Sequence, residues 1–102
     1  MATIIINKDN FEKEVMQSTV PVLIDFFASW CGPCKMLSPT IEQIAEDAKN
    51  FKVCKIDIDE ETALADAFGI MSVPTIAVVK NGVMTAKTVG LKPKEAILAM
   101  IK

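Results

Sequence analysis

The chain has 102 residues, of which 51% are hydrophobic, and its 11 basic and 13 acidic side chains leave a net charge of −2. This size fits one domain spanning residues 1–102, which can build a core without a metal or a structural disulfide. The charges are scattered, which argues against a nucleic-acid-binding surface, and no apolar run is long enough to cross a membrane. Histidine is absent, which excludes histidine-containing metal sites and Cys–His catalysis.

The N-terminal run from Met1 to Ile6 is short and lacks a basic leader, so we expect no signal peptide. A cytoplasmic location follows as the expectation, and thiols are kept reduced in that compartment. The chain has three cysteines, an odd number that makes a poor framework of structural disulfides. The cysteines are therefore available for chemistry.

The first elements are a short strand and a helix. Ile4–Ile6 is apolar and β-branched, which favours a strand. Asp9 and Glu12 have the spacing of a capping box, which predicts a helix that ends near Gln17.

The central part of the chain predicts a strand, a long helix and a second strand. Residues 22–27 are almost continuously apolar, which indicates a strand buried on both faces of a sheet. Apolar residues at helical spacing predict a helix from Pro33 to about Asn50. Pro39 lies inside this helix, where we expect a bend rather than a break. Residues 51–58 predict the second strand.

The last third predicts a helix, a hairpin and a final helix. A short helix around residues 64–68 should end at Gly69. Residues 75–79 and 83–89 have strand patterns, and Asn81-Gly82 between them is a strong hairpin signal. A helix with Pro93 in its first turn completes the chain. The order βαβαβαββα predicts an α/β fold with a mixed sheet covered on both sides.

A Cys-x-x-Cys motif lies at the junction between the strand of residues 22–27 and the following helix. In this context the motif is typical of redox chemistry, since a helix N-terminus stabilises a thiolate. We expect Cys31 to be exposed there and to attack a substrate disulfide, and Cys34, more buried and one turn on, to resolve the mixed disulfide. Pro33 suits a first helical turn, and Gly32 should relieve crowding between the sulfurs.

Two other interpretations of the motif stay open. The pair is half of a zinc site, although only Cys54 is left as a further thiolate ligand. Alternatively, both cysteines are inert helix residues of a protein that binds partners without redox chemistry.

Asp25 stands inside an otherwise apolar strand, six residues before Cys31. Burial of a carboxylate is costly and raises its pKa, which suits a proton acceptor near neutral pH. We hypothesise that Asp25 helps to deprotonate Cys34 through a water molecule. The alternative is a structural ion pair with Lys55, a charged residue in the second predicted central strand. Lys55 in turn either pairs with Asp25 and tunes it, or extends its ammonium to the sheet edge.

The chain resembles the thioredoxin family along essentially its whole length. The segments that carry the resemblance are Asp25 to Met36, Pro39, Lys55-Ile56-Asp57-Ile58-Asp59, Phe68-Gly69-Ile70, Val73-Pro74-Thr75, Lys80-Asn81-Gly82 and Gly90. The resemblance implies a thioredoxin-like fold with a mixed five-stranded sheet and four helices, and a cis peptide bond before Pro74. It also implies a protein dithiol–disulfide oxidoreductase whose redox group is the Cys31–Cys34 disulfide, with no other cofactor.

The resemblance further implies the partners and the surface that binds them. Val73 would offer backbone groups to an extended substrate segment, and Trp30, Pro74 and Gly90 would border an apolar patch for protein partners. Without the resemblance, packing explains Trp30 equally well. The expected partners are disulfide-containing client proteins and a thioredoxin reductase, usually an NADPH-dependent flavoprotein. We expect a monomer.

Three positions depart from the family pattern. Phe27 stands where tryptophan is common, and Met71-Ser72 replaces a more usual Arg-Gly pair, which leaves partner preference open. Cys54 is an extra thiol that we expect to be a small buried hydrophobe, with a regulatory thiol as the alternative. A redox-silent binding subunit with the same fold is the remaining alternative for the whole protein.

Overall fold

The computed structural model describes residues 3–102, and within them five strands form one mixed sheet in the order β1-β3-β2-β4-β5. The strands are β1 (Ile4–Ile5), β2 (Val22–Phe27), β3 (Lys52–Asp57), β4 (Thr75–Lys80) and β5 (Val83–Val89). Strands β1, β3 and β2 are parallel, whereas β4 is antiparallel to both β2 and β5. The mixed sheet expected from the sequence is confirmed.

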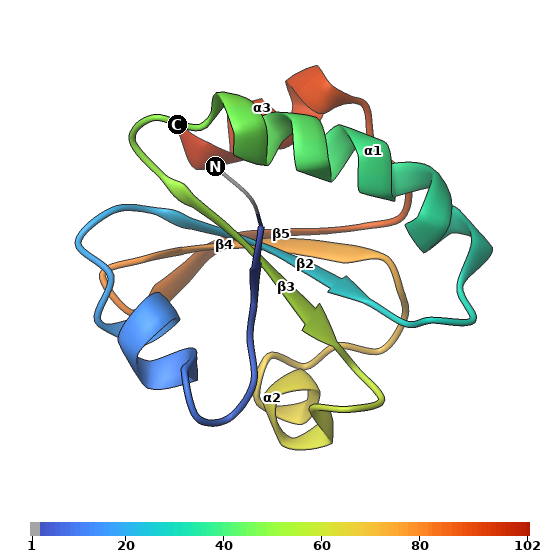
Figure 1. Ribbon diagram of the computed structural model, residues 1–102, viewed down its shortest axis with the longest axis horizontal. Coiled ribbons are helices and arrows are strands. Elements are labelled where there is room, and N and C mark those ends of the chain that lie inside the picture. Colours follow the sequence, from blue (N-terminus) through green and yellow to red (C-terminus); the bar gives the residue numbers. More distant parts are fainter. Residues whose placement is uncertain (1–2) are drawn as a thin grey trace.

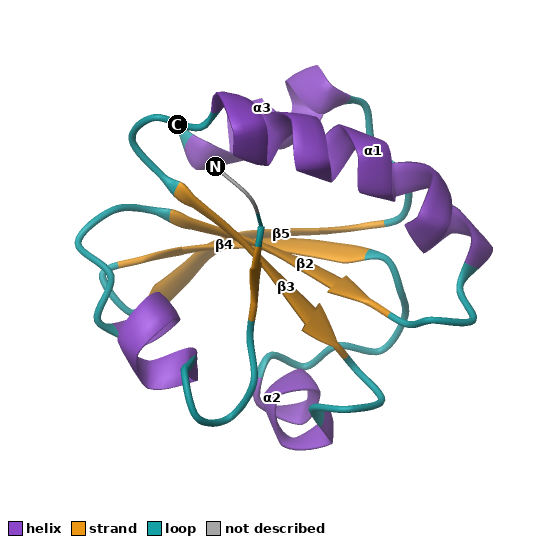
Figure 2. Cartoon of the chain, in the orientation of Figure 1, coloured by secondary structure: helices purple, strands orange, loops and turns teal. Residues whose placement is uncertain are grey.

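Helices cover both faces of this sheet (Figures 1 and 2). They are a short π-helical segment η1 (Glu12–Met16) and the α-helices α1 (Gly32–Asp47), α2 (Thr62–Ala67) and α3 (Lys94–Ile101). Helices α1 and α3 pack on one face, and η1 and α2 on the other. None of the helices in residues 3–102 is long and apolar enough to span a membrane.

Strand β2 lies at the centre of the sheet, between β3 and β4. Val22, Ile24 and Phe26 enter the core beneath η1 and α2, whereas Leu23 enters the core beneath α1 and α3. Because successive side chains of a strand alternate between faces, Asp25 lies on the same face as Leu23, beneath α1. The predicted burial of this strand on both faces is confirmed.

Two turns follow the local signals in the sequence. Gly69 follows α2 with φ +67°, and its N–H donates to the carbonyl of Asp66 at 3.0 Å. Asn81 and Gly82 join β4 to β5 and both have positive φ, 53° and 78°. A tight hairpin needs left-handed backbone at both central positions, which asparagine and glycine tolerate best.

The predicted capping box at Asp9 and Glu12 is wrong. Asn7 occupies the capping position instead, and its Oδ1 accepts the N–H groups of Asp9 at 2.8 Å and Asn10 at 3.1 Å. Asn10 completes the box, since its Oδ1 accepts the N–H of Asn7 at 2.8 Å. The short asparagine amides satisfy these donors one turn before η1, so no cap side chain is needed at its start.

Two predicted helix boundaries also shift. Helix α1 continues through Pro39 without a break and ends at Asp47, three residues before the predicted end at Asn50. Pro93 precedes α3 as its N-cap and does not lie within the first turn. Proline lacks an N–H and suits a position where no helical N–H is required.

Candidate active site

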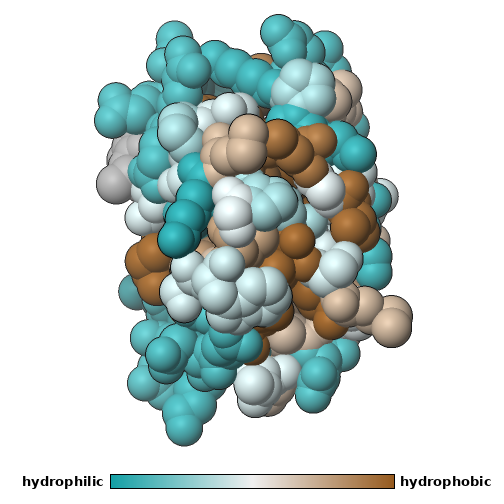
Figure 3. All heavy atoms as spheres, turned by 90° about the vertical axis from the view of Figure 1, so that its right-hand side faces the viewer, coloured by the Kyte–Doolittle hydropathy of each residue, from teal (hydrophilic) through white to brown (hydrophobic). Residues whose placement is uncertain are grey.

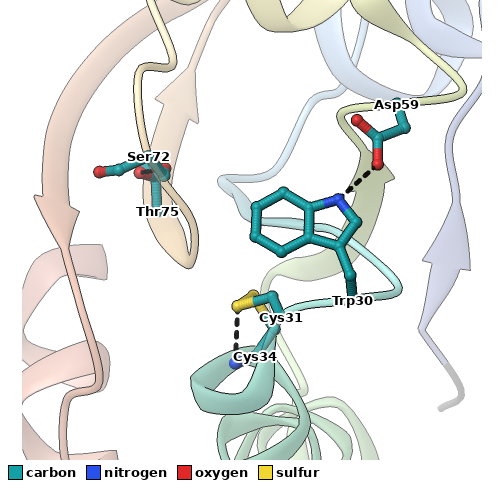
Figure 4. Close-up of a disulfide and its surroundings, with 6 residues drawn as sticks. All are labelled: Trp30, Cys31, Cys34, Asp59, Ser72 and Thr75. Carbon is teal, nitrogen blue, oxygen red and sulfur yellow. Dashed lines mark hydrogen bonds between the residues drawn. A yellow bond between two sulfur atoms is a disulfide. The ribbon is translucent and has the colours of Figure 1, made fainter.

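The two cysteines of the Cys-x-x-Cys motif lie where β2 leads into α1, as the sequence predicts. Cys31 is the N-cap residue of α1, and its Sγ accepts the backbone N–H of Cys34 at 3.1 Å (Figure 4). The pair forms a disulfide, with the two Cα atoms 5.2 Å apart. Pro33 occupies the first turn of the helix. The sulfur of Cys31 therefore takes the place of the oxygen that usually caps a helix.

The expected difference in exposure between the two cysteines is wrong. Cys31 is 3% exposed and Cys34 is 5% exposed, so the expected attacking residue is as buried as its partner. Both cysteines pack with Ala28, and Val73 lies against this cluster. Val73 is far from both cysteines in the sequence, so the local pattern around the motif does not indicate that its loop covers them.

Gly32 is the first residue of α1. Apart from its chain neighbours Cys31 and Pro33 and the nearby helix backbone, a Cβ atom at this position would meet no heavy atom within 4 Å. The expectation that Gly32 relieves crowding between the sulfurs stays a prediction.

Trp30 directly precedes Cys31 and is 67% exposed, with its ring near the disulfide (Figure 4). Its indole Nε1–H donates to the Oδ2 of Asp59 at 2.8 Å. Of the two open interpretations of Trp30, the exposed ring favours a contact surface. Asp59 was missed in the sequence. Asp59 follows β3, as Trp30 follows β2. Because β2 and β3 are parallel neighbours, their carboxyl ends meet at one edge of the sheet, and this predicted arrangement could have placed Asp59 near Trp30.

The segment around Pro74 lies beside the disulfide. The Val73–Pro74 peptide bond is cis, as the family resemblance implies, and the Thr75 hydroxyl donates to the carbonyl of Ser72 at 2.7 Å. Gly90 donates its N–H to the carbonyl of Pro74 at 2.9 Å and has φ +97°, a conformation that favours glycine. The structure thus brings Val73, Pro74 and Gly90 together, next to the cysteines.

Apolar side chains gather at this end of the molecule (Figure 3). Met71, which precedes the Pro74 segment, is 97% exposed, and Met36 and Leu91 are also exposed. Large exposed apolar side chains of this kind are typical of a surface that binds other proteins.

Asp25 is 1% exposed, and its Oδ1 has no hydrogen-bond partner among the described residues 3–102. Burial raises the pKa of the Asp25 carboxyl to about 6, against a lowering effect of Lys55 and with a further rise from Glu42. A carboxyl group with this pKa can accept and release a proton near neutral pH.

Lys55 is the neighbour of Asp25 across β2 and β3, but its ammonium extends towards α1. The Nζ lies 3.4 Å from the Ser38 hydroxyl, 3.9 Å from Oε2 of Glu42 and 4.9 Å from the centre of the Phe27 ring. Within residues 3–102 its ion pair is with Glu42 rather than with Asp25. Lys55 therefore influences the pKa of Asp25 without pairing with it directly.

A pocket of about 180 Å³ opens beside Cys34. Its lining consists of Phe27, Ala28, Ser29, Cys34, Lys35, Ser38 and Lys55. This volume holds several water molecules, and the polar side chains in the wall can bind them. Cys34 and Lys55 thus face the same pocket.

Cys54, the third cysteine, is fully buried in β3, as expected for a small core residue. Burial raises the pKa of its thiol to about 12, with a smaller lowering effect of Lys52. Within residues 3–102 no group of three or more Cys, Asp or Glu side chains is placed as metal ligands would be.

The chain is similar to known proteins over nearly its full length. The family model described as Thioredoxin matches residues 2–102. A thioredoxin of Rickettsia felis is 44% identical over 97 residues, which cover 94% of this chain and 92% of that protein. A thioredoxin of Streptomyces clavuligerus is 42% identical, with 91% and 87% covered. The solved structure of a mutant thioredoxin from Halobacterium salinarum NRC-1 superposes with a TM-score of 0.89 at 37% identity, with 98% of this chain and 88% of that chain covered.

Proposed function

The chain belongs to the thioredoxin family and is a protein-disulfide reductase, and on that basis we propose that Cys31 is its nucleophile, Cys34 its resolving thiol and Asp25 its proton acceptor. The observation that carries this assignment is the position of Cys31 as the N-cap of α1, with its sulfur facing the N–H of Cys34.

In the first step, the thiolate of Cys31 attacks one sulfur of a substrate disulfide. A bond forms between that sulfur and Cys31, the substrate S–S bond breaks, and the other substrate sulfur leaves as a thiolate. The N–H of Cys34 and the positive end of the α1 dipole both stabilise negative charge on the sulfur of Cys31. The geometry therefore favours Cys31 over Cys34 as the attacking residue.

In the second step, the thiol of Cys34 gives its proton to Asp25 through water in the adjoining pocket. The resulting thiolate attacks Cys31, the mixed disulfide breaks, and the second substrate sulfur leaves as a thiolate. The Cys31–Cys34 disulfide forms, and two electrons have passed to the substrate. The pKa of Asp25, raised to about 6, supports this assignment, as does the pocket beside Cys34, whose wall includes Lys55, the cross-strand neighbour of Asp25.

An extended substrate segment has a binding position along the Val73–Pro74 segment. Within residues 3–102 the N–H and C=O of Val73 make no backbone–backbone hydrogen bond, so both are free to pair with a substrate strand. Trp30 and Gly90 border the same surface. Of the other residues in the site, Lys55 tunes Asp25, and Pro33 fixes the first turn of α1.

Family membership implies substrate proteins with disulfides and a reductase that restores the dithiol. We propose that this reductase is an NADPH-dependent flavoprotein and that the protein works as a monomer of one domain, residues 1–102. We also place it in the cytoplasm, where a reducing supply keeps thiols reduced.

Mixed-disulfide trapping with a disulfide-bonded protein substrate tests these roles. We expect Cys34→Ser to accumulate a covalent adduct through Cys31, since the resolving thiol is gone, and Cys31→Ser to accumulate none. Cys54→Ala is the matched control, because it removes a thiol outside the pair and should behave as the parent protein does.

Three results would contradict the assignment. An adduct with Cys31→Ser but none with Cys34→Ser would reverse the two roles. Absence of an adduct with either variant, together with an inactive parent protein, would favour the redox-silent binding subunit. For Asp25, an unchanged rate of product release from the mixed disulfide in Asp25→Asn would remove it from the mechanism.

A further inference from the structure

Lys55 is the neighbour of Asp25 in the sheet, but its ammonium is held by side chains of helix α1. Asp25 and Lys55 are direct partners across β2 and β3, and the side chains of both lie on the face covered by α1. The ammonium of Lys55 nevertheless contacts the Ser38 hydroxyl at 3.4 Å and Oε2 of Glu42 at 3.9 Å. Both of these contacts belong to α1, and neither belongs to β2.

Ser38 and Glu42 follow Cys34 at steps of four residues, so the three side chains lie along one stripe of the helix. Ser38 and Lys55 also line the pocket beside Cys34. The Thr3 hydroxyl donates to Oε2 of Glu42 at 3.4 Å, a second contact that restrains the carboxylate. One helix thus carries the resolving thiol and both groups that hold the lysine.

We infer that Ser38 and Glu42 are positioning residues that hold the ammonium of Lys55 against α1 and away from Asp25. The functional consequence rests on the proposed role of Asp25 as proton acceptor. A direct pair between Lys55 and Asp25 would stabilise the ionised carboxylate and weaken it as a base. By engaging the lysine, α1 leaves the carboxyl of Asp25 with a proton affinity suited to neutral pH.

The surroundings of Asp25 are consistent with this arrangement. Lys55 on β3 and Glu42 on α1 are the charged groups that act on it, and they oppose each other. Its neighbour on β4 is the apolar Ile76, and Cys34, which becomes titratable when reduced, lies in the first turn of α1. Glu42 is therefore well placed to set how much of the Lys55 charge Asp25 experiences.

Titration of the Asp25 carboxyl by carbon-detected NMR, in the disulfide form, tests the inference without depending on turnover. In Glu42→Gln we expect the pKa of Asp25 to fall by roughly half a pH unit, because the freed ammonium moves towards Asp25. Glu95→Gln is the matched control, since Glu95 is exposed on α3 and its substitution changes the net charge equally. It should leave the pKa of Asp25 unchanged.

The same substitution in a Lys55→Met background separates positioning from direct repulsion. We expect most of the Glu42→Gln effect to disappear there, because Glu42 acts through the lysine. An unchanged pKa in Glu42→Gln, or a shift that persists in full without the lysine, would overturn the inference. The proposed function is tested separately: Asp25→Asn with normal resolution kinetics would reject the proton-acceptor role even if the NMR shifts are as expected.

Discussion

The Cys31–Cys34 pair and Cys54 are all buried, yet their surroundings favour opposite states of the thiol. Cys31 caps α1, and its sulfur accepts a backbone N–H. Cys54 lies in the middle of β3 with Ile4 and Ile24 as its neighbours in the sheet, and burial raises the pKa of its thiol to about 12. Donors at a helix start, rather than exposure to solvent, thus distinguish Cys31, the proposed nucleophile, from the core cysteine Cys54.

The buried polar side chains show the same kind of contrast. Ser18 donates to the carbonyl of Val20, and Thr75 donates to the carbonyl of Ser72, both at 2.7 Å. Asp25 is also buried, but within residues 3–102 its Oδ1 has no hydrogen-bond partner. Buried polar groups in stable proteins are nearly always paired, so a buried carboxyl oxygen with no partner among the described residues supports the role proposed for Asp25.

The most severe loss should be in turnover. Cys31→Ala should lower the rate of protein-disulfide reduction by at least about a thousandfold, because no other residue replaces the nucleophile. Cys54→Ala should retain most of the activity, since the core thiol takes no part. A steady-state assay with a disulfide-bonded protein checks both variants, and a comparable loss in the two would erase the proposed distinction.

The next effect concerns the reactivity of the thiols. In the reduced protein at pH 7, alkylation should modify Cys31 at least about a hundredfold faster than Cys54. This pH is about five units below the pKa of the Cys54 thiol, which is raised to about 12, and Cys54 is also fully buried. Mass spectrometry of timed samples gives the two rates. Equal rates in the folded protein would show that the helix start does not activate Cys31.

The third effect concerns stability and its pH dependence. The pKa of Asp25 rises from 3.8 in the unfolded reference to about 6 in the fold, so the folded state binds the proton more tightly. Stability linked to this group is therefore highest below pH 3.8 and falls as the pH rises to about 6. The loss amounts to about 3 kcal/mol when complete.

Urea unfolding of Asp25→Asn at pH 4 and pH 7 checks this linkage. We expect the variant to be more stable than the parent at pH 7, by up to about 3 kcal/mol, and to lose that advantage towards pH 4. Asp66→Asn is the control, because Asp66 is exposed on α2. An advantage of Asp25→Asn that is the same at both pH values would contradict a raised pKa.

The smallest expected effect concerns the hydrogen bond between Trp30, beside the disulfide, and Asp59. Asp59→Ala removes the acceptor of the Trp30 indole N–H, an exposed hydrogen bond worth about 1 kcal/mol or less. We expect higher mobility of the ring and a fall in kcat/KM of about fivefold or less. Fluorescence anisotropy reports directly on Trp30, the single tryptophan of the chain. Glu60→Ala, which alters the adjacent exposed acid, should change neither property.

Local patterns were sufficient for most of the fold. Continuous apolarity identified β2 and its burial on both faces, and Asn81-Gly82 identified the hairpin between β4 and β5. The helix start near Asp9 was predicted wrongly because several polar residues there have compatible spacing. Which of them caps the chain depends on backbone geometry that the spacing does not specify.

The sequence also contained a pattern for Ser38 and Glu42 that was not used to predict the site. Ser38 and Glu42 follow Cys34 at helical spacing, so the pattern already placed them on one side of α1. Their importance depends on Lys55, which belongs to a strand more than ten residues further along the chain. The sequence left open whether that lysine pairs with Asp25 or extends elsewhere, and the packing of α1 on the sheet decides it.

The amino-acid sequence was enough to identify the redox pair, its position at a strand-to-helix junction and the carboxyl group in the buried strand. These features depend on periodicity and on neighbouring residues, which a single segment contains. The three-dimensional arrangement was needed to show that Val73 covers Cys31, that Asp59 accepts the Trp30 N–H and that Gly90 binds Pro74. Each of these contacts joins segments that come together only when the sheet aligns the ends of its strands.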